Sequence, residues 1–301
     1  MLFTRLTVRR VRATVPFRGT FVHVSRGETL HVWEQGAGPV LLLLHGLGGH
    51  MGNYAYGVAE RLATNHRVVI VDRPGSGHSS RLGTTPADLT TQATALAELI
   101  AKLRLGQPLV VGHSFGGAVA LALALEHPDA VAGLALIAPL THLPEAAPAA
   151  FKALTISPRW LRQAFAWTLA VPAAIVYRKE VLGQLFGPEA VPRDYVTRAG
   201  ALLSLLPSHF LATGDDLQAL RAHLPAISAR YSHLRVPLWV LYGAEDRILN
   251  GLDNGLALVN KVAGAQLQQV PGGHMLPITQ PALTADFIRQ AARQSVKPPL
   301  S

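Results

Sequence analysis

Short runs of apolar residues alternate with longer amphipathic segments along much of the chain, and their spacing predicts its secondary structure. The run over residues 39–44 is apolar at every position, which is typical of a strand covered by helices on both faces of a parallel sheet. Similar runs predict strands over residues 67–71, 108–111, 131–137, 236–241 and 266–270. Helical patterns cover residues 87–103, 115–126, 252–263 and 281–294. The alternation predicts an α/β fold with helices on both faces of a mostly parallel sheet.

Two parts of the chain depart from this alternation. Residues 21–24 and 30–33 are short β-like runs joined by a Ser-Arg-Gly-Glu turn, a pattern that predicts an antiparallel hairpin. Residues 141–234 contain helical patches and several prolines but no apolar run typical of a buried strand. We therefore expect a core formed by residues 21–140 and 235–301, interrupted by a helical cap over residues 141–234. A basic leader, residues 1–20, precedes the core.

The composition excludes several classes of protein. Of the 301 residues 49% are hydrophobic and only 15% are charged, which excludes a disordered chain. Cysteine is absent, so disulfide scaffolds, cysteine-based zinc sites, iron–sulfur clusters and a cysteine nucleophile are excluded as well. The sequence shows neither the spacing of a metal-binding motif nor a phosphate-binding loop. We therefore expect no cofactor and no bound metal.

The charge balance raises the question of an anionic partner. The chain has 27 basic and 18 acidic residues, and its one dense basic patch is formed by Arg5, Arg9, Arg10 and Arg12. A generally basic surface is the favoured interpretation, and no nucleic-acid partner is expected, because nucleic-acid-binding residues usually cluster. The basic start lacks the apolar segment of a signal peptide, and the apolar stretch over residues 163–177 is too short to cross a bilayer. We expect a soluble, cytoplasmic protein, with weak contact to a membrane surface as an alternative.

The clearest chemical signal is the segment Gly-His-Ser-Phe-Gly-Gly over residues 112–117. It lies between a predicted strand and a predicted helix, so Ser114 would sit on a tight turn with its hydroxyl above the carboxyl edge of the sheet. Glycines at 112 and 116 allow the backbone to crowd around a strained residue. The start of the following helix supplies a backbone N–H and a positive dipole end that favour developing negative charge. Ser114 is therefore a candidate nucleophile.

A serine nucleophile needs a base, and the base needs an acid that orients it. His274 lies on a glycine-rich loop after the last predicted strand, at the sheet edge where open α/β sheets build their sites. Asp246 follows the strand over residues 236–241 at the same edge, and Glu245 is its neighbouring competitor. His113 and His45 are interpreted as structural. The candidate triad is Ser114, Asp246 and His274.

With these residues in place, the chain resembles the α/β-hydrolase family. Residues 112–117 are similar to the nucleophile turn of that family, residues 45–49 to its His-Gly oxyanion loop, and residues 72–79 to its turn after the next strand. The resemblance covers residues 21–292 except the cap and implies an eight-stranded sheet. It also implies Ser114 as nucleophile, His274 as general base, and the backbone N–H groups of Leu47 and Phe115 as the oxyanion hole. Each such donor contributes on the order of 3 kcal/mol.

A serine at this turn indicates acyl transfer through an acyl-enzyme, whereas family members that open epoxides or displace halide use a carboxylate there. The cap would line an apolar acyl pocket with Trp160, Phe165 and Trp167, and Met275 would join them from the core. Packing of these residues between cap and core is one alternative, and a membrane-surface contact formed by Trp160, Trp167 and the basic leader is another. The leading hypothesis is a carboxylesterase or lipase-like hydrolase acting on a small-molecule, apolar ester. A perhydrolase (haloperoxidase-type) or C–C bond hydrolase with the same triad, and a small-molecule receptor that keeps the fold, remain open. The oligomeric state is not predicted.

Overall fold

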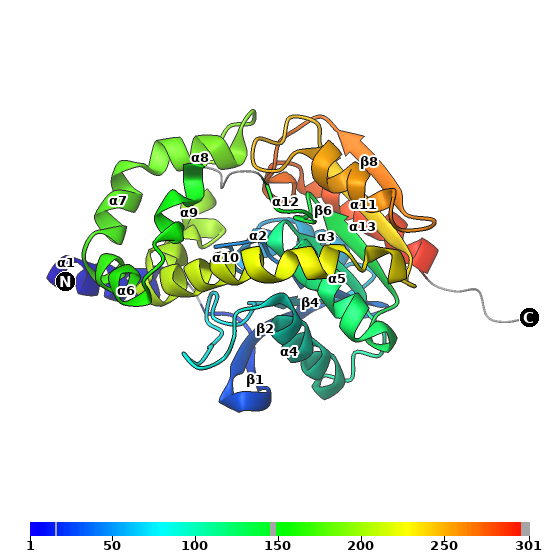
Figure 1. Ribbon diagram of the computed structural model, residues 1–301, viewed down its shortest axis with the longest axis horizontal. Helices are drawn as coiled ribbons and strands as arrows, with labels where there is room; N and C mark the ends of the chain where they lie inside the picture. Colours follow the sequence, from blue (N-terminus) through cyan, green and yellow to red (C-terminus); the bar gives the residue numbers. More distant parts are fainter. Residues whose placement is uncertain (16, 145–148, 296–301) are drawn as a thin grey trace, which may run out of the picture.

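Eight strands form a single sheet at the centre of the computed structural model, which describes residues 1–15, 17–144 and 149–295 (Figure 1). The strand order is β1-β2-β4-β3-β5-β6-β7-β8. Strand β2 runs antiparallel to both of its neighbours, and every other adjacent pair is parallel. The strands are β1 (Thr20–His23), β2 (Thr29–Gln35), β3 (Val40–Leu44), β4 (Arg67–Val71), β5 (Leu109–His113), β6 (Gly133–Ile137), β7 (Leu238–Gly243) and β8 (Gln266–Val270).

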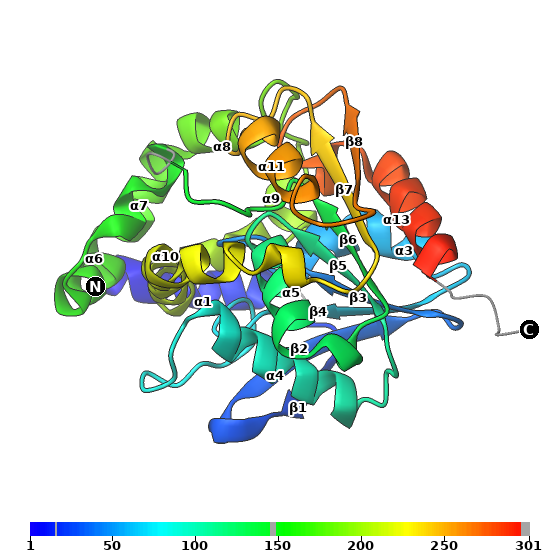
Figure 2. The ribbon, with the colours of Figure 1, turned by 45° about the vertical axis from the view of Figure 1, so that its right-hand side comes forward.

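Helices cover both faces of the sheet, which explains why its central strands are apolar throughout. In β3, Leu42 and Leu44 pack into the core on one face, whereas Leu41 and Leu43 pack into the core on the other, and all four are fully buried. This period of two follows from the alternating direction of side chains along a strand. One face is covered by α4 (Leu89–Lys102), α5 (Phe115–Glu126) and α10 (Pro207–Ser228). The other is covered by α2 (Gly52–Ala55), α3 (Val58–Leu62) and α13 (Pro281–Ser295) (Figure 2).

Between β6 and β7 the described chain is helical and contains no strand. These helices form an arch at one side of the sheet, and helix α1 (Leu2–Thr14) lies beside the arch (Figure 1). The helical elements between β6 and β7 are η3 (Ala149–Thr155), α6 (Arg159–Thr168), α7 (Ala170–Val176), α8 (Arg178–Phe186), α9 (Tyr195–Arg198), η4 (Ala201–Leu205), α10 and η5 (Tyr231–His233). The remaining short elements are η1 (Ser25–Gly27), η2 (Pro128–Ala130), the π-helical turn η6 (Leu252–Leu256), α11 (Ala257–Val259) and α12 (Leu276–Thr279).

The predicted fold class is confirmed. The sheet has eight strands and is mostly parallel, and the predicted hairpin is present with Phe21 opposite His31. Strand β4, strand β8 and helix α5 have the bounds predicted from the sequence, and the other strands differ by a few residues at their ends. Helix α1 was not predicted within the basic leader. Among the described residues, no helix is long and apolar enough to cross a membrane.

Glycines at the turn after β5 permit a close approach of backbones that no other residue would allow. A Cβ on Gly116 would collide with the carbonyl oxygen of Leu44 and would lie 2.6 Å from that of His45. A Cβ on Gly112 would lie 2.6 Å from the carbonyl oxygen of Gly116. The start of α5 therefore packs directly on the end of β3 and on its own preceding strand.

This packing gives a stability prediction. The substitution Gly116→Ala should lower the free energy of unfolding by about 1–3 kcal/mol, since the added methyl group forces the backbones of β3 and α5 apart. Gly183→Ala in α8 is the matched control, because no described atom beyond its chain neighbours and its own helix backbone lies within 4 Å of a Cβ at that position. Alanine should leave stability unchanged or raise it there, by up to about 1 kcal/mol. Equal denaturation midpoints for the two variants in urea would contradict this prediction.

Candidate active site

Ser114 occupies the turn between β5 and α5 in a strained backbone conformation. Its φ is +53° and its ψ is −119°, a combination that non-glycine residues rarely adopt. Hydrogen bonds hold it there: its N–H donates to the carbonyl of Ile137 at 3.0 Å, and its carbonyl accepts from the N–H groups of Gly117 and Leu140. Such a conformation is the one expected of a nucleophile turn. The residue as a whole is only 9% exposed, so water has limited access to its hydroxyl.

His274 and Asp246 form a direct hydrogen bond although they follow different strands. The Nδ1 atom of His274 lies 2.7 Å from the Oδ2 atom of Asp246, and both side chains are buried. The other carboxylate oxygen accepts from the N–H groups of Ile248 and Leu249. Burial alone would raise the pKa of Asp246, but the His274 imidazole and these donors hold it below its ordinary value. The carboxylate fixes the proton on Nδ1, which leaves Nε2 of His274 as the acceptor.

His113 connects the turn at Ser114 with the loop that carries His274. Its Nε2–H donates to the carbonyl oxygen of His274 at 3.0 Å, and the two ring centroids are 4.9 Å apart. Burial, together with the neighbouring His274 ring, lowers the pKa of His113 to about 3, so its ring is neutral at physiological pH. Within the described part of the chain, no hydrogen bond joins the Ser114 hydroxyl to His274. Catalytic hydrogen bonds are often long without substrate and tighten when it binds.

The loop after β3 closes the other side of the turn. A Cβ on Gly46 would lie 3.1 Å from the Cβ of Ser114, so this loop and the turn are in contact. His45 holds the loop by donating from Nδ1 to the carbonyl of Gly46 at 2.8 Å. In the residues that the structure describes, the N–H groups of Leu47 and Phe115 have no hydrogen-bond partner. Both amides are therefore available to an oxyanion.

Arg73 is fully buried beneath this loop and fixes its shape. Its Nε–H donates to the carbonyl of His45 and its Nη2–H to that of Gly46, each at 3.0 Å. Its guanidinium also lies 4.5 Å from the ring centroid of Phe115, at the start of α5. The turn over residues 72–79, which the sequence marks out by its resemblance to an α/β-hydrolase turn, thus supplies the side chain that holds this loop.

Three residues of the helical segment between β6 and β7, called the cap below, contact these loops, and the sequence singled out none of them. Asp216 in α10 accepts from Nη1 of Arg73 at 2.9 Å and also pairs with Arg81. His209 in α10 donates from Nε2 to the carbonyl of Gly48 at 2.9 Å. Glu189 accepts from the N–H of Gly273 at 2.8 Å, next to His274. No motif surrounds any of the three, so no sequence signal could have identified them.

Glu245 has a separate role from its neighbour Asp246. Its carboxylate accepts from the N–H of Gly272 at 2.5 Å and does not contact the imidazole of His274. Together, Glu189 and Glu245 bind two successive amides of the loop that precedes His274. Two carboxylates therefore fix the position of this loop, one from the core and one from the cap.

The four predicted pocket residues are not gathered in one place. Trp160 is 72% exposed on the outer side of α6, contrary to the expectation that it lines a pocket, because Arg162 and Ala166 occupy the buried side of that helix. The ring of Phe165 is tilted against that of Phe210 in α10, with ring centroids 5.7 Å apart. Trp167 is half-buried beside α1. Met275 packs next to His274 in an apolar cluster with Phe186, Tyr195, Ala199 and Ile278.

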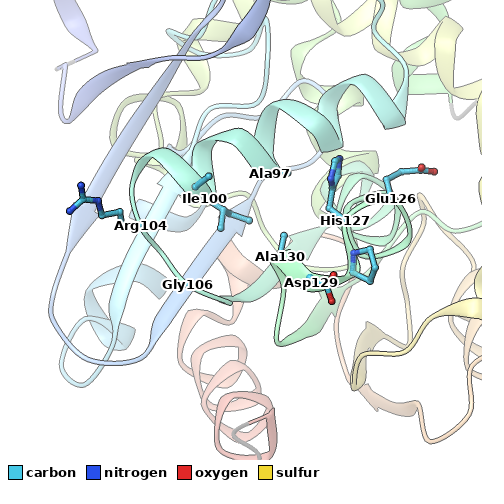
Figure 3. A pocket seen from close by; sticks show the side chains of 10 residues that line it. Ala97, Ile100, Arg104, Gly106, Glu126, His127, Asp129 and Ala130 are labelled. Atoms are coloured by element: carbon cyan, nitrogen blue, oxygen red, sulfur yellow. The ribbon is translucent and has the colours of Figure 1, made fainter.

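A surface hollow lies at the opposite edge of the sheet from these loops. Figure 3 shows it between the end of α4 and the η2 turn, with Ile100, Arg104, His127 and Asp129 around it. These residues precede β5 and β6, whereas Ser114 follows β5. Among the described residues, no group of three or more histidine, aspartate or glutamate side chains could hold a metal ion.

Comparison with known proteins identifies the family. The sequence model of the alpha/beta hydrolase fold matches residues 39–281. The chain is 35% identical over 225 residues to a pimeloyl-[acyl-carrier protein] methyl ester esterase of Vibrio vulnificus, covering 73% of this chain and 81% of that protein. It is 32% identical over 279 residues to the protein of the same name from Chromobacterium violaceum, covering 87% of this chain and 96% of that protein.

Solved structures share the fold. A thermophilic esterase from Thermogutta terrifontis superposes with a TM-score of 0.76 at 24% identity, covering 93% of this chain and all of that one. This likeness concerns the arrangement of strands and helices alone. Together, the sheet order, the family match over most of the chain and the hydrolase relatives show that the chain belongs to the alpha/beta hydrolase fold family and is an enzyme of that family.

Proposed function

We propose that this enzyme is a serine hydrolase that cleaves a carboxylic ester through an acyl-enzyme on Ser114. The observation that carries the proposal is the 2.7 Å hydrogen bond between His274 and Asp246 on loops beside the strained Ser114 turn. Such an arrangement supplies a base of fixed tautomer on a loop beside the turn that carries the nucleophile. The free amides of Leu47 and Phe115 supply the matching oxyanion hole.

Acylation follows from these positions. The Ser114 hydroxyl attacks the ester carbonyl while Nε2 of His274 takes its proton, and Asp246 stabilises the imidazolium that forms. The negative charge on the former carbonyl oxygen is stabilised by the N–H groups of Leu47 and Phe115 and by the start of α5. The tetrahedral intermediate then collapses, and His274 returns the proton to the departing alcohol.

Deacylation repeats the same steps with water in place of the serine. His274 removes a proton from a water molecule, whose oxygen attacks the acyl carbonyl. The second tetrahedral intermediate releases the carboxylic acid, and the proton on His274 returns to the Ser114 oxygen. Neither step draws on any group besides this chain and water.

The substrate we propose is an ester of an apolar acyl chain. Met275 and the apolar residues packed on it adjoin the base, and such walls favour hydrocarbon over charged groups. The curated relatives named as methyl ester esterases support ester cleavage in particular. A panel of p-nitrophenyl esters of increasing acyl length, tested beside a C–C substrate of the ring-cleavage type, checks this choice. Turnover of the C–C substrate alone would contradict it.

The first prediction concerns the nucleophile. The substitution Ser114→Ala should lower kcat for a p-nitrophenyl ester by about 10⁶-fold, because no other group replaces the attacking oxygen. An organophosphonate should label the parent enzyme at Ser114 and leave the variant unlabelled, as measured by intact mass. The thermal unfolding midpoint serves as the control and should stay close to that of the parent. Normal turnover by this variant would refute the assignment.

The second prediction separates the two neighbouring acids. Asp246→Asn should lower kcat by about 10⁴-fold, since the amide no longer fixes the proton on Nδ1 of His274. Glu245→Gln is the matched control, because its carboxylate binds the N–H of Gly272 instead of the imidazole. Its loss of activity should be far smaller. If Glu245→Gln proves the more damaging change in steady-state kinetics, Asp246 is the wrong acid.

The third prediction concerns the cap residue Glu189. Removing its carboxylate in Glu189→Ala should lower kcat by about 10- to 100-fold, because the loop before His274 loses one of its two anchors and the base is misplaced. KM should change little. Glu180→Ala, an exposed change on α8, is the control and should have no effect. Equal kinetics for both variants would mean that the cap does not position the base.

A further inference from the structure

Large apolar side chains are concentrated at one end of the described structure. Of the described residues, sixteen large hydrophobic ones are exposed, and ten of these belong to α1, α6, α7 or the residues that flank these helices. Leu2 and Val176 are each 73% exposed. An exposed apolar surface of this kind usually marks an interaction site. We name it the apolar end surface, and it consists of Met1, Leu2, Phe3, Leu6, Trp160, Leu161, Leu169, Ile175, Val176 and Tyr177.

The helices that carry this surface are joined to one another. The hydroxyl of Thr4 in α1 donates to the carbonyl of Trp167 in α6 at 3.0 Å. Helices α6 and α7 follow each other directly, and both α1 and α7 pack against η4. Figures 1 and 2 show α1, α6 and α7 together at the same end of the molecule in both views. The exposed side chains therefore belong to one region.

Helix α1 is held with its first turns facing solvent. Its second half is anchored by Val11, which packs with Val15 against Leu203 and Leu206. Its first half leaves Leu2, Phe3 and Leu6 exposed, with Arg5, Arg9 and Arg10 exposed between and after them. An amphipathic helix with large apolar residues and arginines is typical of proteins that lie in a membrane interface.

The positive charge of the chain is concentrated in the same segments. Residues 1–15 and 149–179 contain nine of the 27 basic residues and none of the 18 acidic ones, so the rest of the chain carries 18 of each. Arg159 and Arg162 pair with Asp215. Within the described residues the other seven form no ion pair and are exposed: Arg5, Arg9, Arg10, Arg12, Lys152, Arg178 and Lys179. The two segments thus carry a surplus of nine basic residues, part of which Asp215 offsets by pairing with Arg159 and Arg162.

We propose that the apolar end surface docks on the face of an anionic phospholipid bilayer, with its apolar side chains at the acyl boundary and its cations at the lipid phosphates. Both features are needed, because apolar burial and attraction to anionic headgroups together give stable interfacial binding. A second copy of the chain would bring two sets of unpaired cations together. An acidic protein would pair with the cations, but its negative charge alone would not bury a tryptophan and several aliphatic side chains. The inference does not rest on the proposed ester hydrolysis.

Co-sedimentation with vesicles tests this proposal. The full chain should sediment with phosphatidylcholine vesicles that contain phosphatidylglycerol and remain in the supernatant with phosphatidylcholine alone. Raising the salt concentration should weaken binding. The double variant Arg5→Gln/Arg9→Gln should bind about 30-fold more weakly, and Val176→Ser about 10-fold more weakly. Ser114→Ala should bind like the parent, so a failure of the proposed chemistry would not affect this result.

Matched controls use residues elsewhere on the surface. Arg235→Gln/Arg293→Gln removes the same charge, and Leu252→Ser removes an apolar side chain that is 60% exposed, so neither should change binding. Tryptophan emission should shift to shorter wavelength on anionic vesicles, and Trp160→Phe should abolish most of that shift without abolishing sedimentation.

Three outcomes would overturn the proposal. The first is the absence of sedimentation with anionic vesicles. The second is an equal loss of binding in the control variants. The third is a protein that ignores vesicles but forms a concentration-dependent dimer, or binds polyglutamate, and loses this property on Val176→Ser or Arg5→Gln/Arg9→Gln. The surface would then be covered by another copy or by an acidic polypeptide.

Discussion

The buried guanidinium of Arg73 is the interaction on which the arrangement of the site depends. It binds the carbonyls of His45 and Gly46, lies over the ring of Phe115 and pairs with Asp216 of the cap. One side chain thus links the loop after β3, the start of α5 and helix α10. Because removing one partner of a buried ion pair costs about 3–5 kcal/mol, the shape of the loop and the seating of the cap are energetically coupled.

Around this link the mostly parallel sheet brings the three candidate catalytic residues to one edge. Ser114, Asp246 and His274 each follow a different strand, and parallel strands end on the same side. The cap adds contacts to two loops at this edge, since His209 binds the carbonyl of Gly48 and Glu189 binds the N–H of Gly273. Residues between β6 and β7 therefore hold two of the loops around Ser114.

Much of this was predictable from the sequence. The uniformly apolar strands predicted a sheet covered on both faces, and the structure has Leu41–Leu44 divided between two cores. Helix α1 was not predicted, since arginines interrupt its apolar positions and its buried face is narrow. Trp160 was assigned to a pocket because aromatic residues suggest one, but the turn of α6 directs Arg162 inward and Trp160 outward.

The sequence by itself determined the fold class and the candidate order of serine, aspartate and histidine after successive strands, because the period of apolar residues and the glycines of tight turns are local signals. Only the tertiary structure decided that Asp216 meets Arg73, that Glu189 meets Gly273 and that α1 lies against α6. The first of these pairs joins residues 143 positions apart, and no local pattern encodes it. Asp216 and Glu189 reach their partners only when the cap packs on the core. Their contacts with Arg73 and Gly273 therefore follow from tertiary packing.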